Sequence, residues 1–110
     1  MDNVKNDKYY IEKIIKDMSF ILENAGSYTQ IQLQNNEILI DSIMFRLIQI
    51  SENSDKLTEE FKEKYNTIPW RAIKGMRNRI VHEYGNVDFS VVYQTVQNDI
   101  PVILEELKKV

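Results

Sequence analysis

Three observations in this 110-residue sequence predict an all-α protein. Only three glycines and two prolines interrupt the chain, so a long helix has few places where it must stop. Apolar residues recur at three- and four-residue intervals, which is the periodicity of amphipathic helices. No two segments offer themselves as paired strands. We therefore expect residues 1–110 to form one domain, an up-and-down bundle of four main helices plus a short helix.

The first half of the chain predicts two of the main helices. Residues 3–25 carry an apolar stripe that ends at Ala25, and Gly26 follows as a helix stop. Residues 30–33 predict a short helical entry, and residues 35–53 predict the second main helix. This second helix is apolar around much of its circumference, which indicates burial both in the core and against a second copy of the chain.

The second half predicts a short helix and two further main helices. Residues 58–65 form the short helix, with Thr58 as its N-cap. A helix over residues 68–83 opens after Pro69, whose fixed φ suits a first turn, and closes at Gly85. Asp88 caps the last helix, which Pro101 should kink or restart near Asp99. A strand is the alternative for residues 90–96, which are rich in β-branched side chains.

Composition excludes several classes of protein and site. Hydrophobic residues make up 43% and charged residues 28% of the chain, as in soluble globular proteins. No apolar run approaches the roughly 18 to 20 residues of a membrane span, and the polar N-terminus lacks a signal core, so we expect a cytoplasmic protein without a membrane partner. With no cysteine and one histidine, we expect no disulfide, no metal site and no cofactor.

Charge is distributed unevenly along the chain. The net charge is −3, but residues 62–79 contain six basic residues and one acidic residue, a local charge of +5 that leaves −8 on the remainder. This predicts positive potential around residues 68–83, with Arg71, Lys74 and Arg79 as candidate RNA contacts. The alternative is that these side chains form solvated faces and intrahelical pairs.

The residues that carry chemistry gather in the same segment. Arg77, Asn78, His82 and Tyr84 lie within eight positions, and His82 is the only histidine. On an ideal helix, Arg77 and His82 diverge by about 140°. They could share one site if the helix loosens near Gly85, or if a second chain completes the site. Tyr84 could instead be a core aromatic, and Trp70 is more readily explained as a core residue than as a base-stacking one.

A family resemblance follows from these residues. Arg77 and His82, separated by four residues, followed after one further residue by Tyr84, resemble the R-x4-6-H signature of HEPN domains. The longer run from Ile68-Pro69-Trp70 through Gly75-Met76-Arg77-Asn78 to His82-Glu83-Tyr84 and Val87-Asp88 resembles the HepT-like proteins. One departure is Ser51-Glu52-Asn53, where that family usually shows Gly-Glu-Ala.

The resemblance implies a HEPN-like fold and a metal-independent ribonuclease toxin of a type VII-like toxin–antitoxin pair. His82 would then be the acid/base, because the unperturbed pKa of a histidine lies near neutrality and suits proton transfer there. Arg77 would bind the phosphate and transition state, and Asn78 would orient His82 or the phosphate. One imidazole per chain cannot easily be both acid and base, so a homodimer would supply two.

The resemblance also implies a protein partner. The neighbouring MntA-type minimal nucleotidyltransferase of this family neutralises the toxin by transferring AMP to the tyrosine that matches Tyr84. A different class of function stays open: a non-catalytic scaffolding or substrate-binding subunit of a nucleotidyltransferase, favoured by the acidic remainder of the chain. A purely structural bundle would leave the clustering of Arg77, Asn78, His82 and Tyr84 unexplained.

Overall fold

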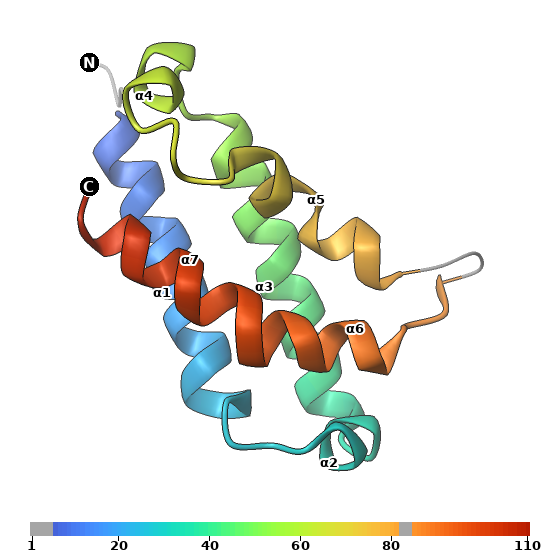
Figure 1. Ribbon diagram of the computed structural model, residues 1–110. Coiled ribbons are helices and arrows are strands. Elements are labelled where there is room, and N and C mark those ends of the chain that lie inside the picture. The colour runs from blue at the N-terminus through green and yellow to red at the C-terminus, as the bar shows by residue number, and fades with distance from the viewer. Residues whose placement is uncertain (1–5, 82–84) are drawn as a thin grey trace.

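A computed structural model describes residues 6–81 and 85–110, and its ordered elements are helices (Figure 1). Within these residues there is no strand, only an isolated antiparallel bridge between Val81 and Val87. The elements are α1 (Asp7–Ala25), α2 (Gln30–Gln34), α3 (Glu37–Asp55), α4 (Glu59–Lys64), α5 (Trp70–Ile80), α6 (Phe89–Gln94), the π-helical turn η2 (Thr95–Asp99) and α7 (Ile100–Lys108). The all-α prediction is confirmed.

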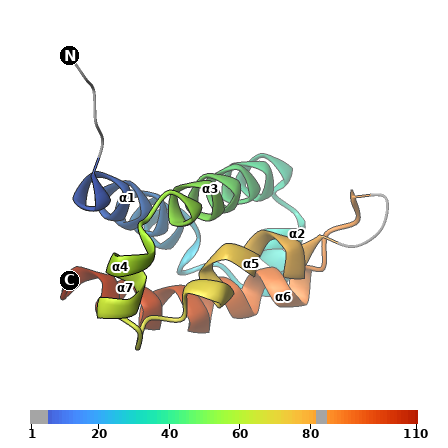
Figure 2. The same cartoon turned by 90° about the horizontal axis from the view of Figure 1, so that it is seen from above.

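The main helices form a ring in which each helix contacts two others. α3 packs against α1 and α5, while the rod made of α6, η2 and α7 contacts α5 through α6 and α1 through α7. Figure 2 shows α1 and α3 in one layer, with α5, α6 and α7 below them. Successive main helices alternate in direction, so the start of α1 and the end of α7 lie at the same end of the molecule (Figure 1). This is the predicted bundle of four main helices.

The core is made of one apolar stripe from each main helix. Each fully buried aliphatic side chain contributes about 1.5–3 kcal/mol relative to exposure. The stripes keep the three- and four-residue spacing of the sequence pattern, so periodicity and packing agree. The most buried members are Ile14, Met18 and Ile21 of α1, Ile43, Leu47 and Ile50 of α3, Ile73, Met76 and Ile80 of α5, and Ile100 and Leu107 of α7.

Two predicted helix starts are confirmed in atomic detail. The Thr58 hydroxyl accepts a hydrogen bond from the Phe61 N–H at 3.2 Å and so caps α4. The Asp88 carboxylate accepts hydrogen bonds from the N–H groups of Ser90 and Val91 and caps α6. Asp7 of α1 also accepts hydrogen bonds from the Thr58 backbone and hydroxyl, which fixes α4 against the start of the bundle.

Pro101 alters the last helix close to the predicted position. In η2 the Ile100 N–H donates to the Thr95 carbonyl, five residues earlier. Proline has no N–H and its ring crowds the preceding turn, so a wider turn relieves both effects. The helix therefore continues past Asp99 with a π-helical turn in place of a sharp break. The strand alternative for residues 90–96 is wrong, because these residues lie in α6 and η2.

None of the helices within residues 6–81 and 85–110 combines the length and apolar character that crossing a membrane requires.

Candidate functional site

The helix α5 is held in place by its apolar side and by Trp70. Ile73, Met76 and Ile80 are fully buried on the side of α5 that joins the core. The Trp70 indole N–H donates to the carbonyls of Lys62 and Tyr65 at 3.3 and 3.2 Å, so the indole fastens the α4–α5 connection. Trp70 is therefore a structural residue here, as the sequence favoured.

Arg77 and Asn78 lie together at the edge of a shallow hollow. The Arg77 Nη1 donates to the Asn78 Oδ1 at 3.3 Å. The hollow has a volume of about 290 Å³ and is lined by these two residues of α5 and by Ile48, Ser51 and Glu52 of α3. Arg77 is half-buried and Asn78 is exposed, so the guanidinium and the amide can both reach a ligand from solvent. We call this feature the α3–α5 hollow.

The three α3 residues of the hollow were not predicted as site residues. In the sequence, Ser51 and Glu52 are distinctive only because they belong to a departure from the family pattern. They lie about 25 residues before Arg77 in the sequence, and only the packing of α3 on α5 brings them beside it. The Ser51 hydroxyl donates to the Lys74 carbonyl at 2.9 Å and fixes this packing.

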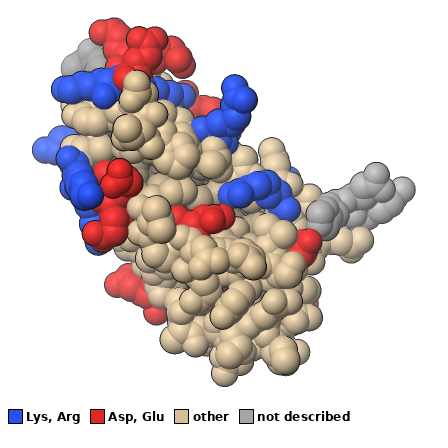
Figure 3. Space-filling view, in the orientation of Figure 1, with Lys and Arg blue, Asp and Glu red and all other residues tan. Residues whose placement is uncertain are grey.

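The candidate RNA-contact residues have different surroundings. Lys74 is 3.0 Å from the Asp55 carboxylate, and Arg79 is 3.5 Å from the Asp99 carboxylate. These pairs are half exposed, and such pairs stabilise a protein by about 0–1 kcal/mol, so a phosphate could replace either carboxylate. Arg71 is exposed. On the face shown in Figure 3, basic side chains lie in several separate groups among acidic ones and do not form a continuous patch.

The end of α5 differs from the prediction. The predicted helix over residues 68–83 ends at Ile80, because Val81 is extended with φ −96° and ψ 122°. Val81 bridges to Val87, and the Asp88 N–H donates to the Ile80 carbonyl at 2.8 Å. Val81 pairs with Val87 in place of a further helical turn, so α5 is shorter than predicted. The divergence of about 140° between Arg77 and His82 applies to an ideal helix. The extended Val81 interrupts the helix before Gly85, in line with the alternative that the helix loosens there.

His82 and Tyr84 lie outside the described residues, so their predicted roles stay predictions. After this segment, Gly85 has φ +76°, in the left-handed region that favours glycine. The sequence predicted such a conformation at Gly85, although as the end of a helix. Here it forms part of the return from Val81 to the N-cap of α6.

Exposed apolar side chains run along the outer side of α3. Ile38, Phe45 and Ile48 are 81%, 56% and 38% exposed, and their spacing places them on one side of the helix. We call the row Ile38, Asp41, Phe45, Ile48 and Glu52 the outer α3 face. It ends at the α3–α5 hollow, since Ile48 and Glu52 belong to both.

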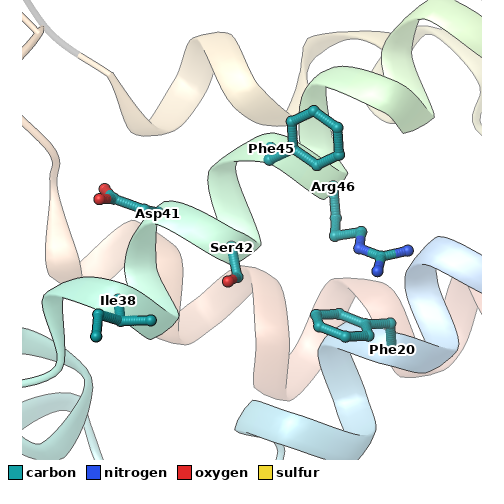
Figure 4. Close-up of a pocket in the computed structure, with 6 residues that line it drawn as sticks. All are labelled: Phe20, Ile38, Asp41, Ser42, Phe45 and Arg46. Carbon is teal, nitrogen blue, oxygen red and sulfur yellow. The ribbon is translucent and has the colours of Figure 1, made fainter.

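A second hollow of about 380 Å³ lies beside this face, between α3 and α1. Its arginine, Arg46, is already engaged: Nη1 lies 2.7 Å from the Asp17 carboxylate. Figure 4 shows the Arg46 guanidinium next to the Phe20 ring, with 3.8 Å between Cζ and the ring centroid. Arg46 is therefore a structural cation that joins α1 to α3, unlike Arg77.

Comparison with known proteins agrees with the resemblance seen in the sequence. The chain is 27% identical over 107 residues to "Putative RNase TTE0752" of Caldanaerobacter subterraneus subsp. tengcongensis, covering 97% of this chain and 96% of that protein. It is 32% identical over 106 residues to "Gamma-glutamylcyclotransferase and putative RNase MJ0434" of Methanocaldococcus jannaschii, covering 96% of this chain but only 48% of that protein. It is 37% identical over 60 residues, or 54% of each chain, to "Probable ribonuclease HepT" of Thermococcus cleftensis.

No solved structure matches the chain. The family described as "Ribonuclease HepT-like" matches residues 8–110, nearly the whole sequence. The predicted family and the predicted enzyme class, a ribonuclease, both agree with this match. This chain belongs to the ribonuclease HepT-like family.

Proposed function

We propose that this protein is a metal-independent endoribonuclease that acts as the toxin of a type VII-like toxin–antitoxin pair. Membership of a ribonuclease family supports the reaction class. The observation that carries the location of the site is the α3–α5 hollow, where Arg77 and Asn78 lie side by side and open to solvent. Both residues were predicted for this role from the sequence.

The proposed reaction is attack of an RNA 2′-oxygen on the adjacent phosphorus. The 2′-hydroxyl loses its proton to a base, the bond from phosphorus to the 5′-oxygen breaks, and an acid protonates the leaving oxygen. The products are a 2′,3′-cyclic phosphate and a free 5′-hydroxyl. Arg77 stabilises the extra negative charge on the phosphorane, because a guanidinium is permanently charged and offers a planar fork of donors. His82 transfers the protons, and Asn78 orients His82 or the phosphate.

We propose that the active form is a homodimer built through the outer α3 face. A row of exposed apolar residues beside the hollow favours contact with another apolar surface. Two copies related by a twofold axis would place two α3–α5 hollows on one groove and supply two imidazoles.

Neutralisation is proposed to occur at Tyr84, by transfer of AMP from an MntA-type nucleotidyltransferase. A nucleotide added two residues from His82 would bring bulk and negative charge to the place an RNA phosphate must occupy. This part of the proposal rests on the sequence motif.

Cleavage assays with purified protein test the proposal. We expect the wild-type chain to cleave RNA equally with and without a metal chelator, and His82→Ala to lose roughly 10²–10⁴-fold in rate. Tyr84→Phe should cleave RNA as the wild type does and should resist inhibition by the nucleotidyltransferase and ATP. An inactive wild-type chain that binds the nucleotidyltransferase would instead support the scaffolding subunit, which the exposed apolar face also favours.

A further inference from the structure

Glu52 is the carboxylate of the α3–α5 hollow. It is exposed and lines the hollow together with Arg77 and Asn78. Within the described part of the chain, its carboxylate has neither a hydrogen-bond nor an ion-pair partner. Two other acidic residues beside α5 are engaged: Asp55 pairs with Lys74, and Asp99 pairs with Arg79. Glu52 is thus an available proton acceptor beside an arginine that also lacks a carboxylate partner.

The position of Glu52 is fixed by contacts on either side of it along α3. The Ser51 hydroxyl donates to the Lys74 carbonyl at 2.9 Å, and Asp55, one turn further on, lies 3.0 Å from the Lys74 ammonium. Both contacts hold α3 against α5 at the level of the hollow. The Cα of Glu52 therefore has a set place relative to Arg77, as a catalytic group requires.

The negative charge of Glu52 indicates a role other than phosphate binding. A site that only held a phosphate would be weakened by a carboxylate next to its arginine, because the two anions repel. A carboxylate in that place is useful if it accepts a proton during the reaction, since it becomes neutral as negative charge develops on the phosphorane. The neighbouring arginine then binds the phosphate that the carboxylate would otherwise repel.

We propose that Glu52 is the general base of the reaction. This inference rests on the proposed function. The Glu52 carboxylate takes the proton from the 2′-hydroxyl as the 2′-oxygen bonds to phosphorus, and His82 gives a proton to the departing 5′-oxygen. Glu52 thus takes the base role that the proposed function gave to a second imidazole, and each chain brings both an acid and a base to the groove of the proposed dimer.

Two substrates separate the two roles. An RNA dinucleotide needs both a base and an acid, because its leaving alkoxide must be protonated. A nucleoside 3′-(4-nitrophenyl phosphate) needs the base only, because nitrophenolate leaves without a proton. We expect Glu52→Gln to lose roughly 10²–10⁴-fold in rate on both substrates. His82→Ala should lose as much on RNA but stay within about tenfold of the wild type on the nitrophenyl ester.

Glu60→Gln is the matched control, since Glu60 is an exposed carboxylate of α4 outside the hollow, and it should keep wild-type rates. Glu52→Gln changes an exposed side chain, and an unchanged unfolding temperature will show that the fold is kept. Wild-type rates for Glu52→Gln on RNA, or its recovery on the nitrophenyl ester alone, would overturn the assignment of Glu52 while leaving the ribonuclease proposal standing. Absence of cleavage by the wild type would overturn both.

Discussion

Arg77 differs from Lys74 and Arg79, two other cations of α5, in what surrounds it. Lys74 and Arg79 each lie beside a carboxylate, whereas Arg77 is half-buried and donates to the neutral amide of Asn78. A partly desolvated guanidinium without a carboxylate keeps its donors for an incoming phosphate. The sequence predicted Arg77 from its spacing to His82 and from the neighbouring motif residues. Both features are local, so they can be recognised without the fold.

Thr95 carries a buried hydroxyl that lowers the stability of the fold, and this effect could not be predicted from the sequence. It is almost fully buried in η2, and its hydroxyl has no hydrogen-bond partner in the described part of the chain. Valine has nearly the same shape without the polar group. We expect Thr95→Val to raise the free energy of unfolding by about 1 kcal/mol. Thermal unfolding at a fixed protein concentration should show a rise in Tm of roughly 4 °C or more.

Thr58→Val is the matched control, because the Thr58 hydroxyl is hydrogen bonded to Phe61 and Asp7. Removing that hydroxyl should lower the free energy of unfolding by about 1 kcal/mol. If Thr95→Val lowers Tm as Thr58→Val does, the Thr95 hydroxyl has a partner that stabilises the fold.

At the scale of elements, features set by neighbouring residues could be predicted, whereas features set by contacts between distant segments could not. Thr58 and Asp88 were predicted as N-caps because a capping side chain bonds to backbone only two or three residues away. The end of α5 was not predicted, because it depends on pairing between Val81 and Val87. The Glu52 side of the site was missed for the same reason, since it comes from packing between α3 and α5.

The contact between α1 and α3 includes a buried ion pair that should matter for stability. The Asp17 side chain is 8% exposed and lies 2.7 Å from Arg46. Removing the arginine leaves a carboxylate buried without a counter-charge, so we expect Arg46→Met to cost roughly 3–5 kcal/mol. Urea unfolding at equilibrium measures this cost as a shift in midpoint.

The double variant Asp17→Leu/Arg46→Met distinguishes the buried charge from lost packing. It replaces both partners by apolar groups and should recover most of the lost stability. A cost below about 1 kcal/mol for Arg46→Met would contradict the view that Asp17 depends on this partner, because exposed pairs have that magnitude.

For the whole molecule, the ring of four main helices accounts for the core but leaves the outer α3 face uncovered. The sequence predicted the fold class and the breadth of the apolar surface of α3, because both follow from periodicity. It could not show which apolar side chains stay outside the core, since this depends on where α1 and α5 pack. The structure leaves Ile38, Phe45 and Ile48 exposed, and Ile48 also lines the proposed site.

The central claim is that two copies of the chain join through this face to form one RNA-cleaving groove. Sedimentation velocity of the purified wild type, Phe45→Glu and Ile31→Glu tests it most directly. Ile31 is an equally apolar, 69% exposed side chain on α2, outside the outer α3 face. The account predicts the mass of two chains for the wild type and Ile31→Glu, and of one chain for Phe45→Glu. A wild type with the mass of one chain, or a Phe45→Glu variant that stays dimeric, would contradict it.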